Sequence, residues 1–99
     1  MFENDRYMTN GVKNTIPQYT QNLIWFLIET MKVEEKDYLQ VFKLSATKVD
    51  GTIRQKIAHI QEQPEYRKEY IILLGNAITA KLFVIDDGDH TTMLMAEEY

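Results

Sequence analysis

The sequence has 99 residues, of which 44% are hydrophobic, and it contains no cysteine. A chain of this length accommodates one domain with a modest core, and the lack of cysteine excludes disulfides, thiolate nucleophiles and cysteine-ligated zinc. Acidic residues outnumber basic ones by 15 to 11, and the resulting net charge of −4 argues against a general binder of nucleic acid or anionic membranes. We therefore expect a single domain over residues 1–99.

The composition and the chain start favour a cytoplasmic protein. A small domain without cysteine suits a reducing compartment. The first seven residues contain neither a basic nor an apolar segment, so we expect no secretory signal. The most apolar window, Leu23 to Ile28, is far shorter than the roughly 20 residues that span a bilayer. We therefore expect no membrane association.

The N-terminal region predicts one short strand. We expect residues 1–5 to be frayed and Arg6 to Thr9 to form a strand. The pair Asn10-Gly11 is typical of a turn and is expected to end this strand.

A helix is predicted next, from about Ile16 to Met31. Thr15 as the N-cap and Gln18 three residues later match a capping box, and Pro17 lies in the first turn, where its missing N–H costs nothing. The apolar stripe of this helix is wide enough to predict burial on more than one side, with Trp25 near the margin of the packed surface.

The middle of the chain predicts three strand regions. Tyr38 to Leu44 is rich in β-branched and aromatic residues on both faces, which favours a central strand, and Ser45 to Gly51 is predicted to be a loop. Thr52 to Gln63 fits both helical and strand spacing. We predict a strand there, because the turn at Pro64 leads directly into a further predicted strand at Tyr70 to Leu74, forming a hairpin.

The C-terminal residues predict a second hairpin. The apolar runs Leu82 to Ile85 and Met93 to Met95 flank Asp87-Gly88, which we expect to be a two-residue loop. That loop places Phe83 and Ile85 on one face with His90, Thr92 and Leu94. In total the chain is predicted to be an α+β domain, with a mainly antiparallel sheet of about five strands and one long N-terminal helix packed across it.

Three segments of the chain resemble a known family. Tyr38 to Phe42, Gln61 to Tyr66 and, above all, Phe83 to Tyr99 are similar to small proteins from low-GC Gram-positive bacteria catalogued as domain of unknown function 960. The resemblance covers nearly the whole chain and is most specific in the C-terminal block. It implies a cytoplasmic bacterial protein, and it implies no catalytic residue because the family carries no known activity.

One polar cluster has the composition of a ligand site: Asp86, Asp87, Asp89 and His90. Carboxylates and an imidazole can coordinate a divalent cation, but residues of this kind are also what a hairpin turn requires. If no cation binds, repulsion among the carboxylates predicts that Asp86→Asn or Asp89→Asn is neutral or mildly stabilising.

Other combinations of residues indicate a functional site less strongly. His59 and Glu62 would share a side only in a helix. Tyr66 and Tyr70 beside basic residues suggest base stacking only if they share a face with them. Residues 43–68 carry six basic and three acidic residues, whereas residues 81–99 carry one basic and five acidic ones. This separation is typical of solvated turns and strand edges, or of a surface that orients a partner or a second copy.

We therefore expect a non-enzymatic protein-interaction module, monomeric or homo-oligomeric, that binds through a sheet edge or through the Trp25 side of the helix. The alternative is a metal- or small-ligand-binding domain, or a hydrolase, that uses the Asp86 to His90 loop. Nucleic-acid binding is the least favoured hypothesis; it would use Arg54, Lys56, Arg67 and Lys68. No cofactor is expected.

Overall fold

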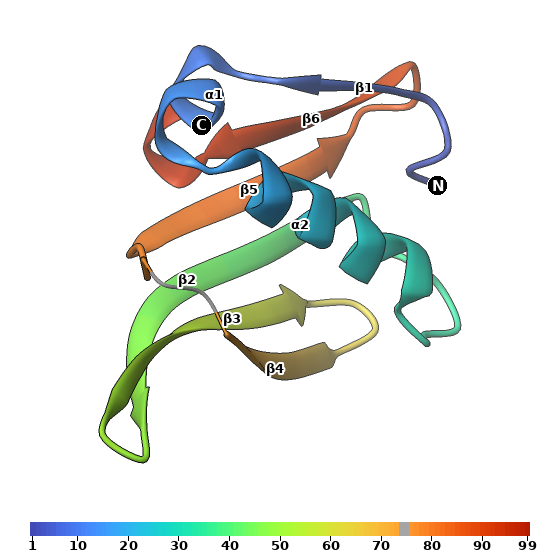
Figure 1. Ribbon diagram of the computed structural model, residues 1–99. Helices are drawn as coiled ribbons and strands as arrows, with labels where there is room; N and C mark the ends of the chain where they lie inside the picture. Colours follow the sequence, from blue (N-terminus) through green and yellow to red (C-terminus); the bar gives the residue numbers. More distant parts are fainter. Residues whose placement is uncertain (74–75) are drawn as a thin grey trace.

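The computed structural model describes residues 1–73 and 76–99 (Figure 1). In these residues the elements are β1 (Asp5–Met8), α1 (Asn10–Thr15), α2 (Gln18–Thr30), β2 (Leu39–Val49), β3 (Thr52–Gln61), β4 (Tyr66–Ile72), β5 (Ala80–Asp86), β6 (His90–Met95) and the 3-10 turn η1 (Ala96–Glu98). The strands form one sheet in the order β1-β6-β5-β2-β3-β4. β1 runs parallel to β6, and the other described neighbours are antiparallel.

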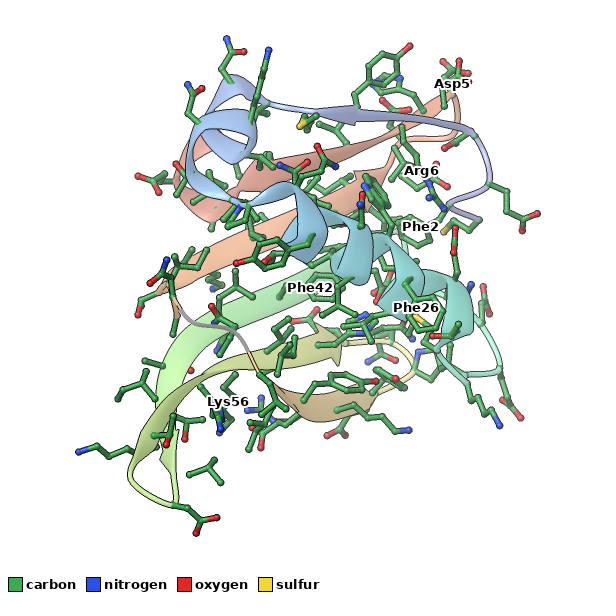
Figure 2. All side chains as sticks on the ribbon, viewed as in Figure 1. Phe2, Asp5, Arg6, Phe26, Phe42 and Lys56 are labelled. Atoms are coloured by element: carbon green, nitrogen blue, oxygen red, sulfur yellow. The ribbon has the colours of Figure 1, made fainter. Side chains whose placement is uncertain are left out.

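α2 crosses one face of this sheet, and the hydrophobic core lies between them (Figure 1). Phe42 of β2 lies beneath the helix, whereas Phe26 is on its outer side and 55% exposed (Figure 2). The α+β class is therefore confirmed. The described sheet differs from the predicted one because it is mixed and has six strands.

The predicted helix from about Ile16 to Met31 is present as α2 but is shorter, and a second helix, α1, which was not predicted, precedes it. α1 has six residues and α2 has 13. Pro17 disfavours helical backbone at the residue before it, and Ile16 is extended, with φ −101° and ψ 121°. Thr15 therefore ends α1 instead of capping α2. The predicted turn Asn10-Gly11 is the first turn of α1, which Thr9 caps by accepting a hydrogen bond from the Val12 N–H.

The strand predictions for the middle of the chain are confirmed in type but not in length. β2 is central, and Thr52 to Gln63 contains a strand. The predicted loop after Leu44 is instead strand through Val49, because Asp50 and Gly51 both have positive φ, the two-residue turn that keeps the hairpin paired to its end. β4 begins at Tyr66, earlier than predicted, and the predicted end at Leu74 lies outside the described residues.

The C-terminal hairpin is confirmed, with its loop one residue later than predicted. The Asp87 N–H donates to the His90 carbonyl at 3.0 Å, so Gly88 and Asp89 are the loop residues, and Gly88 has a φ of 102°. Each residue of β5 therefore pairs two positions further along β6 than expected. Because side chains alternate with a period of two, such a shift leaves every side chain on the predicted face.

None of the helices in residues 1–73 and 76–99 is long and apolar enough to cross a bilayer.

A chain of polar side chains is buried beneath α2. The amide of Gln40 donates to Gln61 Oε1 at 2.7 Å, and its oxygen lies 2.7 Å from His59 Nε2, which makes that nitrogen the protonated one. The His59 ring is fully buried and stacks on Phe42 with ring centroids 4.3 Å apart. Burial disfavours the imidazolium and lowers the pKa of His59 to about 4.

The two chain ends are also tied together. The Glu98 carboxylate accepts hydrogen bonds from the Thr9 hydroxyl at 2.6 Å and from the Met95 N–H at 2.7 Å. A Cβ atom at Gly11 would lie 2.7 Å from a Glu98 carboxylate oxygen. The lack of a side chain at residue 11 thus makes room for the carboxylate that joins α1 to the C-terminus.

The lowered pKa of His59 predicts acid sensitivity. A histidine that protonates near pH 6.5 when unfolded and near pH 4 when folded gives the unfolded state more protons between these values. We expect this group alone to lower the free energy of unfolding by about 3 kcal/mol from pH 7 to pH 4. Denaturation across this range measures the loss. His59→Gln should flatten the slope, and His90→Gln, at the exposed hairpin, should leave most of it.

Gly11→Ala should lower stability although alanine is the better helix former, because its methyl group would displace the Glu98 carboxylate. In a Glu98→Ala background the same substitution should instead stabilise by up to about 1 kcal/mol. Denaturation of the four proteins of this double-mutant cycle tests the contact. Additive effects would show that Gly11 and Glu98 act independently.

Candidate interaction surface

Asp86, the first residue of the acidic cluster, anchors the N-terminus. Its carboxylate accepts hydrogen bonds from the Phe2 N–H at 2.7 Å, the Gly88 N–H at 2.8 Å and the Asn4 amide at 3.0 Å. Phe2 is 2% exposed and packs in the core, so the prediction of a frayed N-terminus is wrong. The Phe2 hydrogen bond is the main cause of the lowered pKa of Asp86.

The remaining cluster residues shape the hairpin loop. One Asp87 oxygen accepts the N–H groups of Asp89 and His90, both at 3.0 Å, and the other lies 3.2 Å from the His90 ring. The His90 N–H is the main cause of the lowered pKa of Asp87. Asp89 is exposed, and no described residue donates a hydrogen bond to its carboxylate. The structure thus brings the four predicted residues to one loop, where Asp86 and Asp87 bind backbone N–H groups.

Metal coordination has no further support from the structure. In the described parts of the chain, histidine and acidic side chains do not come together in groups of three or more arranged to hold an ion. His59 is also separated from Glu62, because they lie in a strand and in the turn after it, with His59 buried beneath α2.

Trp25 serves to attach β1 to the helix. The Arg6 guanidinium lies 4.6 Å from the centre of the Trp25 ring and pairs with Glu29 at 2.7 Å. Trp25 is partly buried and packs against the core. The Arg6 side chain of β1 therefore covers part of the side of α2 that carries Trp25.

We call the face of the sheet opposite α2 the open face. In residues 1–73 and 76–99 no helix covers this face (Figure 1). Strand side chains alternate between the two faces. On β2, for example, Gln40, Phe42 and Leu44 are buried beneath α2, and Leu39 and Val41 are partly exposed on the open face.

Aliphatic and aromatic side chains meet on the open face. Cross-strand pairing aligns Leu94 with Phe83, Phe83 with Val41 and Val41 with Ile60, in a row over four strands. The neighbouring row places Ile85 beside Leu39. We call these six residues the apolar band: Leu39, Val41, Ile60, Phe83, Ile85 and Leu94. Leu94 is buried, and the other five are partly exposed. The Tyr99 ring packs edge-on against Phe83 at 5.4 Å between centroids.

Basic side chains border one side of the apolar band. Lys43 and Lys81, which we call the lysine pair, are direct cross-strand neighbours on β2 and β5, and both are exposed. Lys81 Nζ lies 5.6 Å from the Phe83 ring centre. On the next strand, Lys56 is paired with Glu69 at 3.5 Å.

The predicted base-stacking arrangement forms only in part. By the β3–β4 register, Tyr66, Lys68 and Tyr70 lie on the α2 side of the sheet, whereas Arg67 pairs with Ile60 on the open face. Arg67 also binds Glu69 at 3.0 Å. Sequence reasoning missed the apolar band because apolar residues on both sides of a strand indicate a central position, not which side lacks cover. The cross-strand juxtaposition of Lys43 and Lys81 appears only once the register is known.

The contacts of Asp86 reverse the sequence-based expectation for its replacement. Asp86→Asn puts an amide donor where three donors converge, so we expect a loss of about 2 kcal/mol. Asp89→Asn is the matched control and should change stability by less than about 0.5 kcal/mol. Denaturation with chelator and with millimolar calcium should give the same values. A calcium-dependent gain that either variant abolishes would instead support a metal site.

The comparisons with known proteins agree with this fold. A solved structure described as a protein of unknown function from Enterococcus faecalis matches with a TM-score of 0.75 at 22% identity, over 97% of this chain and 91% of that one. No curated protein matches the sequence. A family model described as "Staphylococcal protein of unknown function (DUF960)" matches residues 5–98. The chain therefore belongs to this family.

Proposed function

We propose that the protein is a non-enzymatic interaction module, located in the cytoplasm, that binds a partner protein through the apolar band of its open face. The observation that carries this proposal is a row of apolar side chains across four strands, over which residues 1–73 and 76–99 place no helix. Contiguous exposed apolar surface bounded by charged residues is characteristic of protein-binding sites.

The roles of the polar residues favour binding over catalysis. Asp86 and Asp87 bind backbone N–H groups, and His59 is enclosed by the core. Ser45, the only serine in the sequence, lies on β2 without the strand-to-helix turn of a nucleophile elbow. The carboxylates of Asp86 and Asp87 are thus engaged in holding the backbone, whereas the apolar band is available for contact with a partner.

The open face is also better suited to binding than the sheet edges are. The edge strand β4 carries Arg67, Lys68 and Glu69 in succession, and charges on an edge oppose pairing with another strand. The other edge, β1, has only four residues. A partner therefore gains more from packing on the face than from extending the sheet.

Variants of the two sides of the molecule test this proposal. Val41→Glu and the milder Ile60→Thr alter the apolar band, while Phe26→Glu alters the exposed outer side of α2 as a control. With tagged protein in a Gram-positive lysate, a protein retained by the wild type and by Phe26→Glu should be lost by at least tenfold with both band variants. Circular dichroism and melting temperature verify that each variant is folded.

Sedimentation of the purified proteins separates the two kinds of partner. A wild-type dimer that becomes monomeric in Val41→Glu would identify a second copy as the partner. Equal retention by all variants, or a loss with Phe26→Glu alone, would contradict binding through the open face.

A further inference from the structure

The lysine pair is an unfavourable arrangement in the free protein. Like charges directly opposite one another destabilise an antiparallel strand pair. Among the described residues, no carboxylate lies within ion-pair distance of Lys43 or Lys81, whereas Lys56 is paired with Glu69 on the neighbouring strands. An anion placed between the two ammonium groups would relieve this repulsion.

The lysine pair adjoins the apolar band on both of its strands. Val41 precedes Lys43 by two residues and Phe83 follows Lys81 by two, so each lysine lies about 7 Å from an apolar neighbour on the same face. Asp87 follows the other end of β5, about 20 Å from Lys81. The open face therefore favours a partner that carries negative charge at the lysine pair and apolar side chains over the apolar band. It disfavours a partner that adds negative charge near Asp87.

We propose that the partner presents an extended acidic segment to this surface, with a carboxylate between Lys43 and Lys81 and aliphatic side chains on the apolar band. This inference rests on the proposed function and names the chemistry of the partner. In an extended chain, residues i and i+2 point the same way and lie about 7 Å apart, which matches the spacing from the lysine pair to the band. The recognised pattern is thus an acidic residue with Val, Ile or Leu two positions before or after it.

The composition of the surface favours a protein segment over single-stranded nucleic acid. Bases bind by stacking on aromatic rings, and the apolar band contains one ring, Phe83, which Tyr99 and Lys81 already contact. The other band residues are aliphatic. A second copy would bring four lysines together where the two-fold axis passes beside the lysine pair, whereas an acidic segment supplies the negative charge that this pair lacks.

A displayed library of random twelve-residue peptides, selected on the immobilised full chain, tests the proposal. We expect enrichment of acidic residues two positions before or after Val, Ile or Leu. A selected peptide should bind Lys43→Glu/Lys81→Glu at least tenfold more weakly than wild type. Binding should also weaken when sodium chloride rises from about 50 to about 300 mM. The control Lys13→Glu/Lys32→Glu makes the same change in net charge at exposed positions outside the sheet and should alter affinity less than twofold.

A stability measurement guards against misfolding as the cause. Lys43→Glu replaces a repulsive cross-strand pair with an attractive one, so its melting temperature should be equal to or above that of the wild type while its peptide binding falls. Loss of binding together with a lower melting temperature in this variant would overturn the proposal.

The outcomes separate this inference from the proposed function. One outcome is that selected peptides bind Val41→Glu more weakly than wild type and yet show no enrichment of acidic residues; another is that they bind the lysine variants as tightly as wild type. Either outcome would overturn the acidic partner but would still support binding through the open face. If no peptide is enriched from the library, the proposal that the partner is an extended segment is overturned. The proposed function is tested separately by the lysate experiment. Binding of a single-stranded oligothymidine that depends on Phe83 would assign the surface to nucleic acid instead.

Discussion

The packing of α2 on one face of the sheet is the interaction on which the rest of the structure depends. The helix buries Ile24 and Ile28 completely against strand residues such as Phe42 and Leu82, and the core consists of residues on this side. A domain of this size has few residues left for a second covering layer. The opposite face therefore keeps partly exposed apolar side chains, and the fold itself creates the surface that we propose for binding.

Polar side chains complete this one-sided core at its margins. Gln40, His59 and Gln61 form a hydrogen-bonded chain beneath the helix, which offsets much of the cost of burying their amides, whereas His59 Nδ1 has no hydrogen-bond partner among the described residues. Asp86 and Glu98 join residues that are 84 and 89 positions apart in the sequence. Both carboxylates thereby hold the chain ends against β5, β6 and α1, and the acidic C-terminal region has a structural role.

Elements whose formation depends on residues close in sequence could be predicted from local sequence patterns. Alternation and β-branched content identified β2, β3 and the C-terminal hairpin, and the loop shift at Gly88 preserved every face because it moved the register by two. The start of α2 was predicted about two residues too early because the capping box at Thr15 competed with the restriction that Pro17 imposes on Ile16, and the restriction prevailed. Phe2 had no local signal, since its burial depends on a carboxylate at the other end of the chain.

The acidic loop and the open face show why composition is a poor guide to the site in this chain. Aspartates around a glycine have the same composition in a turn as in a cation site, and only the direction of the backbone N–H groups distinguishes them. Here those N–H groups point at Asp86 and Asp87 and satisfy them. Lys43 and Lys81, by contrast, are separated by 38 positions and become neighbours only through the pairing of β2 with β5. A surface assembled from residues distant in sequence leaves no motif, and its charge and shape are defined by strand register alone.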